Sequence, residues 1–212
     1  MARDQTEFPP VFLSHWAQIP SEFFDDFAAE VSGAGIPLSI APRQDRGIYA
    51  GVEWLIPTVV VAYIAKSYFD GFLGEMGRDH YVALKSALAK LAGKLALLKI
   101  TVFASGQHKV RADQPYSFAY SVVAEAGPGL NFKLLLQAEL DESQCDLAID
   151  AFLKFLRGYH GGTLEDHMVA ALANGRATGG IILLSYSPTT QCLQVLDPFS
   201  RSPEGRSPTM RS

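Results

Sequence analysis

The fold is decided by residues 56–95, which read IPTVVVAYIAKSYFDGFLGEMGRDHYVALKSALAKLAGKL. The first part, Thr58–Ile64, is dominated by β-branched and aromatic residues without polar alternation, which is typical of a strand covered on both faces. From Lys66 onward apolar residues recur three or four positions apart, which predicts a long helix lying on a sheet. Gly74 and Gly77 each weaken a helix by about 1 kcal/mol relative to alanine, so we expect a kink or a short break there.

The residues before this stretch predict a strand, a helix and a second strand. Val11–Leu13 is a short apolar run, and Pro20 followed by Ser21 is typical of a helix start. An apolar stripe follows at helical spacing: Phe23, Phe24, Phe27 and Val31. Ile36–Ile40 is the second predicted strand, and the polar loop APRQDRG (41–47) leads from it into the central stretch. This order of elements indicates an α/β layer built from crossover units.

The residues after Leu98 change character and favour hairpins. A Gly-Pro-Gly turn at 127–129 separates two alternating segments, which predicts a hairpin. Asp141 and Gln144 form a capping-box pattern for a helix over Glu142–Tyr159, with a predicted apolar stripe that includes Leu147. The other predicted elements are a strand over Lys99–Ala104, a helix over Leu164–Ala173 capped by Thr163, and strands over Ile181–Tyr186 and Gln191–Leu196.

We therefore predict an α/β or α+β fold. The expected N-terminal half is a mostly parallel sheet with covering helices, and the expected C-terminal half consists of antiparallel hairpins plus helices. The predicted organisation is an arm at 1–10, an α/β half at 11–105, a hairpin-and-helix half at 106–198 packed on it, and a flexible tail at 199–212. One domain and two closely packed halves both fit this pattern.

Composition excludes some function classes. The chain is 48% hydrophobic and 19% charged, which is a globular balance, and its formal net charge of -4 argues against general nucleic-acid binding. Two isolated cysteines, Cys145 and Cys192, suggest a reducing compartment, although the sequence also allows a single disulfide between them. The N-terminus does not have the pattern of a signal peptide, and the longest apolar run, Trp54–Ala65, is too short for a membrane span of roughly 20 residues. We expect a soluble, cytoplasmic protein.

Three polar clusters are candidates for chemistry. The first is Glu75, Arg78, Asp79, His80 and Tyr81, beside the glycine pair, where a carboxylate, an imidazole and a phenol could do acid–base work or hold a metal. Its structural interpretation is a solvated helix face with one ring half-buried.

The second cluster follows the next glycine pair, Gly161-Gly162. Two histidines, His160 and His167, lie close to two acids in a predicted helix start, but without the spacing of a standard metal motif. Ordinary helix capping by Thr163 explains the same residues.

The third cluster is the loop 41–47, with Arg43 and Arg46. Ligands bind beyond the carboxyl ends of parallel strands, so Arg43, Arg46, Lys66 and Glu75 are expected to converge on one crevice. A polar loop with solvated charges is the alternative. The chain has no GxGxxG, P-loop or GxSxG pattern.

The order of elements in residues 10–95 resembles that of TIR domains. VFLSHW (11–16) stands where such domains begin, TVVVAYIA (58–65) stands for a central strand, and Glu75 stands near the place of their catalytic glutamate. The resemblance implies an NAD-cleaving activity that depends on Glu75. It also implies further α/β units, whereas this sequence predicts hairpins after Leu98.

Two function classes follow. The first is a non-catalytic interaction or regulatory protein, with a protein partner or a second copy bound near the aromatic residues Tyr68, Phe69 and Phe72. The alternative is an enzyme acting on a nucleotide or another phosphate-bearing small molecule. For that enzyme the expected catalytic residues are Glu75 and His80, and the expected ligand-binding residues are Arg43, Arg46, Lys66 and Arg78. No cofactor and no metal are predicted.

Overall fold

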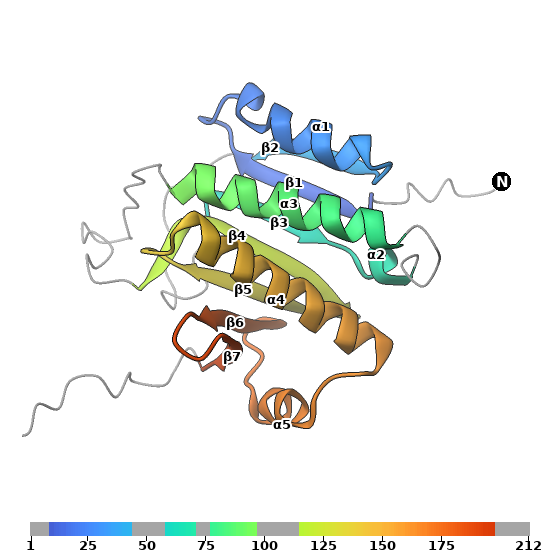
Figure 1. Ribbon diagram of the computed structural model, residues 1–212, viewed down its shortest axis with the longest axis vertical. Coiled ribbons are helices and arrows are strands. Elements are labelled where there is room, and N and C mark those ends of the chain that lie inside the picture. The colour runs from blue at the N-terminus through green and yellow to red at the C-terminus, as the bar shows by residue number, and fades with distance from the viewer. Residues whose placement is uncertain (1–8, 44–57, 71–76, 97–114, 198–212) are drawn as a thin grey trace, which may run out of the picture.

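A mixed sheet of seven strands forms the centre of the part of the chain that the structure describes (Figure 1). The computed structural model describes residues 9–43, 58–70, 77–96 and 115–197. The strands lie in the order β2-β1-β3-β4-β5-β6-β7 across the sheet. Their bounds are Val11–Trp16 (β1), Leu38–Arg43 (β2), Val60–Ile64 (β3), Tyr116–Gly127 (β4), Leu130–Gln137 (β5), Ile181–Ser187 (β6) and Cys192–Leu196 (β7).

The sheet is assembled from three parallel pairs, β1–β2, β3–β4 and β5–β6, each joined by a connection that contains helices. Neighbouring pairs meet in antiparallel contacts, and β7 adds an antiparallel edge. The predicted α/β class is therefore confirmed, with parallel and antiparallel pairing in both halves of the chain. The helices are η1 Ser21–Phe24, α1 Asp25–Gly33, α2 Lys66–Asp70, α3 Gly77–Ala96, α4 Glu142–Gly161 and α5 Asp166–Asn174.

Strands from both predicted halves belong to this one sheet, because β3 pairs directly with β4. Several predictions lie outside the described residues. They are the boundary at residue 105, the strand at 99–104, most of the arm and the whole of the tail at 199–212.

The helices α1, α3 and α4 lie side by side over the same face of the sheet (Figure 1). This placement has a topological consequence. The strands β3 and β5 run in opposite directions, yet both crossovers step the same way across the sheet and place their helix on the same face. The two crossovers therefore have opposite hands. In the view of Figure 1 the β5–α4–β6 connection is the left-handed one, which is the rare hand for parallel crossovers.

The core lies between this helical layer and the sheet. Alternate strand residues point into it, as shown by Val11 and Leu13 on β1 and by Val60, Ala62 and Ile64 on β3, all fully buried. The predicted helical stripes supply the other side: Phe24, Phe27 and Val31 at the first helix, Leu84, Leu88, Leu91 and Leu95 on α3, and Ile149, Phe152, Leu153 and Leu156 on α4 are buried. Tyr68 and Phe69 belong to the same core.

Three local expectations are wrong. The central strand is not fully covered on both faces, because Val61 and Tyr63 are only half-buried. Leu147 is 45% exposed, so the buried stripe of α4 does not include it. Thr163 does not cap α5, whose N-cap is Glu165 without a side-chain cap hydrogen bond. The backbone N–H of Thr163 instead donates to Gly158 O at 2.8 Å, as part of the C-terminal cap of α4.

The capping box predicted for α4 is confirmed. The carboxylate of Asp141 accepts from the backbone N–H of Gln144 at 2.8 Å, and the Gln144 side chain accepts from the backbone N–H of Asp141 at 3.1 Å. Two N–H groups that the helix itself cannot satisfy are paired in this way.

We expect Asp141→Ala to lower the free energy of unfolding by about 1 kcal/mol, because one capping interaction is lost. Urea denaturation followed by circular dichroism measures the change. Glu139→Ala, at an exposed position outside the helix, is the control and should change stability little. Equal stability of Asp141→Ala and the wild type would show that the box contributes nothing.

Candidate functional site

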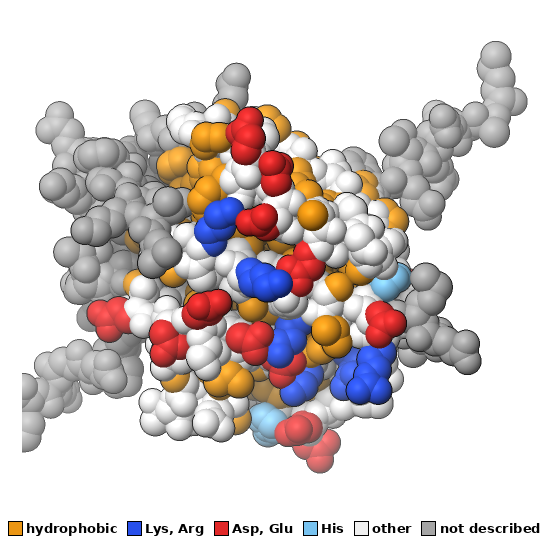
Figure 2. All heavy atoms as spheres, turned by 45° about the horizontal axis from the view of Figure 1, so that its top comes forward, with side chains coloured by type: hydrophobic (Ala, Val, Ile, Leu, Met, Phe, Trp, Pro, Cys, Tyr) orange, Lys and Arg blue, Asp and Glu red, His pale blue; other side chains and the backbone are white. Residues whose placement is uncertain are grey.

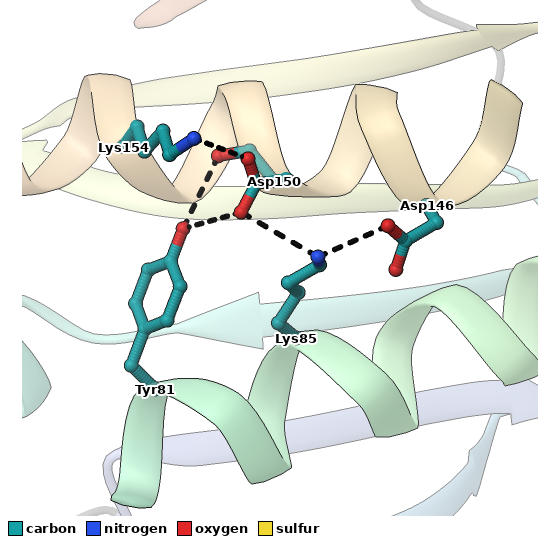
Figure 3. Close-up of polar contacts among 5 residues, drawn as sticks. All are labelled: Tyr81, Lys85, Asp146, Asp150 and Lys154. Atoms are coloured by element: carbon teal, nitrogen blue, oxygen red, sulfur yellow. Dashed lines mark hydrogen bonds and ion pairs between the residues drawn. The ribbon is translucent and has the colours of Figure 1, made fainter. Parts of the chain in front are cut away.

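A polar network joins α3 to α4 on the outer side of the helical layer (Figure 3). Asp150 is its centre. The Tyr81 hydroxyl donates to Asp150 Oδ1 at 2.9 Å, and Lys154 Nζ lies 2.6 Å from Asp150 Oδ2. Lys85 Nζ lies 3.7 Å from Asp150 Oδ1 and 3.0 Å from Asp146 Oδ2, so this lysine bridges two carboxylates of α4.

Every group at the centre of this network is held in its usual protonation state. Burial raises the pKa of Tyr81, and its bond to Asp150 raises the pKa further. Burial alone would raise the pKa of Asp150, but the bonds from Lys154 and Tyr81 outweigh it and lower the pKa. Burial likewise opposes the charge of Lys85, but Asp146 and Asp150 raise its pKa. A general acid or base works best with a pKa near the working pH, so this network is suited to clamping two helices rather than to proton transfer.

A groove of about 840 Å³ runs along the network between α3 and α4. Its charged lining consists of four carboxylates and two lysines: Asp141, Glu142, Asp146, Asp150, Lys85 and Lys90. Both lysines are already paired, Lys85 as above and Lys90 with Glu30 at 3.0 Å. The groove therefore has a net excess of negative charge. In Figure 2 the helical face shows charged side chains of both signs with apolar surface between them.

The apolar part of this groove includes Val82, which is 58% exposed and lies in the second turn of α3. The two helices come close where α3 has Gly93, since a Cβ there would lie 3.5 Å from Glu142 Cγ. This approach fixes one end of the groove, and the Tyr81–Asp150 bond fixes the other.

A second titratable cluster lies where β3 and β4 end. The backbone N–H of Lys66 donates to Glu125 Oε2 at 2.9 Å, and Lys66 Nζ pairs with Asp70 at 2.5 Å. The His160 ring stacks on Phe69 with centroids 4.8 Å apart. Burial lowers the pKa of His160, and Lys66 adds to this effect although the backbone of Glu125 acts against it. His160 is therefore held neutral at pH 7.

Lys133 is buried in the middle of the sheet, where it is 5% exposed. It lies on β5 between Val123 of β4 and Leu183 of β6. It points away from the helical face, because its neighbour Phe132 packs against α4. Burial, together with the charge of Arg43, lowers the pKa of Lys133 to about 8.

The prediction that Arg43 and Lys66 converge on one crevice is wrong, because the strands that carry them run in opposite directions. Arg43 ends β2, and its guanidinium donates to the carbonyl oxygen of Thr58, just before β3 begins. Lys66 follows the end of β3. Because β1 and β2 run antiparallel to β3, the C-terminal end of β2 lies beside the N-terminal end of β3. Arg43 and Lys66 therefore lie at opposite ends of the strands.

The other predicted site residues have separate surroundings. Arg78 is exposed in the first turn of α3. His80 lies beside Gly35, where a Cβ would be 4.0 Å from Nε2. Among the described residues, no hydrogen bond or ion pair joins Lys66, Arg78 and His80. Arg46 and Glu75 lie outside the described residues, so their roles stay predictions.

The second predicted cluster is also divided. His160 lies against Phe69, whereas His167 pairs with Glu165 at 3.2 Å on the exposed start of α5. Within the described part of the chain, no three His, Cys, Asp or Glu side chains are placed to hold a metal ion. Cys145 is buried on α4 and Cys192 is exposed on β7, and both are free thiols.

Sequence reasoning missed Asp150, Asp146 and Lys133. The two aspartates lie on the polar side of a predicted helix, and only the packing of α4 against α3 shows that they meet Lys85. Lys133 carried a signal that was available, namely a single charge in the apolar segment LNFKLLL of a predicted strand.

Comparison of the chain with protein-family models, with curated proteins and with solved structures gives no match. None of the described helices is both long enough and apolar enough to cross a bilayer. After the β4–β5 hairpin the described chain continues with one further parallel crossover, from β5 through α4 and α5 to β6, and then with the antiparallel β6–β7 pair.

Lys133 gives a test of these electrostatics. With a folded pKa of about 8 and an ordinary value of 10.5, the unfolded chain binds more protons between these values. The free energy of unfolding should therefore rise with pH in that window. Relative to Lys133→Met, the wild type should gain on the order of 1 kcal/mol from pH 8 to pH 9.5. Denaturant titrations at both pH values measure this gain. A difference between the two proteins that does not change with pH would contradict the lowered pKa.

Proposed function

We propose that the protein is a non-catalytic partner-binding protein, and that its α3–α4 groove docks a basic, amphipathic helical segment of a protein partner. The observation that carries this proposal is the groove of about 840 Å³ with its excess of carboxylates and its exposed Val82. The sequence favours the same class of function through the lack of a catalytic motif.

The charge of the groove selects a basic partner. Asp141 and Glu142 at its one end form no ion pair with a described residue, and both are exposed. A lysine or arginine of a partner would find carboxylates there that have no cationic partner among the described residues, whereas an acidic segment would be repelled. Its shape favours a helix, because a trough between two packed helices accepts the apolar stripe of a third.

The docking surface differs from the one expected from the sequence. Tyr68 and Phe69 are 8% and 6% exposed and pack in the core, so they are not available to a partner. Phe72 lies outside the described residues. Val82 is the exposed apolar side chain that the groove offers instead.

The experiment uses a fluorescent peptide of about 14 residues, or four helical turns, with leucine on one face and lysine on the other. Its affinity for the full chain is measured by anisotropy. The double variant Glu142→Lys/Ser143→Lys adds positive charge at two exposed positions that line the groove, without touching the Asp150 network. We expect it to weaken binding at least about tenfold, since charge complementarity becomes repulsion.

The matched control is Glu22→Lys, at an exposed acid outside the groove, which should bind the peptide as the wild type does. The proposal would be contradicted by equal binding to the double variant, or by equal binding of a peptide in which glutamate replaces lysine.

A second candidate function is retained on the strength of Lys133. Burial and the charge of Arg43 lower the pKa of Lys133 to about 8, so two cationic side chains lie within electrostatic range of each other. Such a pair of cations suits a phosphate-bearing small molecule. This is the enzyme alternative, an activity on a nucleotide, and an NAD-cleaving reaction at Glu75 is its most specific form. Binding of ATP to the full chain, measured by calorimetry, should be lost in Lys133→Met. Binding that survives this change would remove Lys133 from the candidate.

A further inference from the structure

The outer side of α4 carries its charges in an order that reverses at the middle of the helix. Glu142 and Asp146 come first, Asp150 lies at the centre, and Lys154 and Arg157 follow. At a rise of about 1.5 Å per residue, the two acids lie about 12 and 6 Å before Asp150, and the two bases lie about 6 and 10.5 Å after it. Opposite charges therefore lie at nearly equal distances on either side of one point.

These five side chains share one face of the helix, which we call the α4 ridge. At about 100° per residue they fall within about 120° of the helix circumference. Glu142, Lys154 and Arg157 are exposed, and the side chain of Asp146 is 44% exposed. In the lower part of Figure 2, acidic side chains lie mainly to the left and basic ones to the right. The α4 ridge is therefore acidic toward its N-terminal end and basic toward its C-terminal end.

The two ends of the α4 ridge have charges to offer to a partner. Glu142 forms no ion pair with a described residue. The same holds for Arg157, whose guanidinium lies 5.9 Å from the centroid of the Tyr81 ring. The Asp150 network satisfies the charges between these two ends. A partner can therefore pair with Glu142 and Arg157 without breaking that network.

Apolar side chains accompany these charges. The described chain exposes three large apolar side chains, Val82, Leu147 and Val169. Val82 lines the α3–α4 groove, and Leu147 lies beside the α4 ridge, about 60° from Asp150 around the helix. The face therefore combines apolar contact area with ordered charges, as contact surfaces between proteins do.

The order of the charges selects the occupant. A helix that fits the α4 ridge has to present the opposite charge at each position. The same ridge of a second copy does so when it lies antiparallel, because a two-fold axis at Asp150 places Glu142 of one copy opposite Arg157 of the other. The same axis places Asp146 opposite Lys154. Each contact is made twice, whereas a parallel arrangement would bring like charges together.

We propose that a second copy of this chain is a partner of the α3–α4 face, and that the two copies pack antiparallel along the α4 ridge. Arg157 of each copy then pairs with Glu142 at the end of the other copy's groove. This inference rests on the proposed function, because it takes the α3–α4 face as a docking surface. The two Asp150 carboxylates approach each other at the axis, where each is already bonded to Lys154 and Tyr81 of its own chain.

The test is a charge swap between two full-chain variants. Glu142→Arg places two cations at both symmetric contacts, and Arg157→Glu places two acids there. Each variant alone should dimerise at least about tenfold more weakly than the wild type. An equimolar mixture should recover the dimer, because both contacts of the mixed dimer join opposite charges. Sedimentation velocity over a concentration series measures all three, and added salt should weaken the wild-type dimer.

The matched control pair is Glu22→Arg and Arg176→Glu. Both positions are exposed and lie outside α3 and α4. Each control variant should dimerise as the wild type does, alone and in the mixture. Because all four positions are exposed, every variant should keep the circular dichroism spectrum of the wild type.

Three results would overturn the proposal. They are a wild-type chain that stays monomeric at every concentration, a mixture that is no more dimeric than its two components, and equal weakening of the dimer by the control pair. The basic peptide separates this proposal from the proposed function. A monomeric chain that binds the peptide would remove the second copy and leave the groove as a docking site. A charge swap that restores the dimer, without any binding of the peptide, would support the second copy and remove the separate helical partner.

Discussion

The packing of α3 against α4 on one face of the sheet is the contact on which the rest of the structure depends. The helices α1, α3 and α4 lie on that face, so α3 is held between α1 and α4. The sheet beneath buries the apolar stripe of α3, which consists of Leu84, Leu88, Leu91 and Leu95. The same constraint gives the β5–α4–β6 connection its unusual hand. It also brings Asp150 of α4 within reach of Tyr81 and Lys85 of α3.

The pKa shifts in the Asp150 network differ in direction from those of Lys133 and His160. Around Asp150 each shift moves the pKa of a group further from pH 7. Asp150 and Lys85 therefore stay charged and Tyr81 stays protonated over the physiological pH range, and the groove beside them stays acidic. Lys133 and His160 shift the other way, because burial disfavours their charged forms. These two side chains point to different parts of the molecule. The described titratable groups therefore lie at separate places, and the α3–α4 groove holds only those around Asp150.

Local patterns predicted the elements well, because each depends on neighbouring residues. The β-branched run at 58–64 contains a strand, β3, although only one of its faces is fully buried. The stripe of α3 and the Asp141–Gln144 box form as expected. The site was predicted poorly, because strand direction is not encoded in any one segment. The sequence predicted that Arg43 and Lys66 follow two parallel strands. Because β1 and β3 pair antiparallel, the two residues lie at opposite ends of the strands instead. Asp150 has no local signal in the sequence, because only the packing of α4 against α3 brings it to Tyr81 and Lys85.

The most direct measurement of the central claim is the pKa of the Asp150 carboxyl in the folded full chain, followed by ¹³C NMR of its side chain during an acid titration. The account predicts a value below the ordinary 3.8, because Lys154, Tyr81 and Lys85 all stabilise the carboxylate. A value above 3.8, rising toward neutrality, would contradict it. Asp150 would then be a candidate proton donor or acceptor, and the α3–α4 face would have to be considered as a reaction centre.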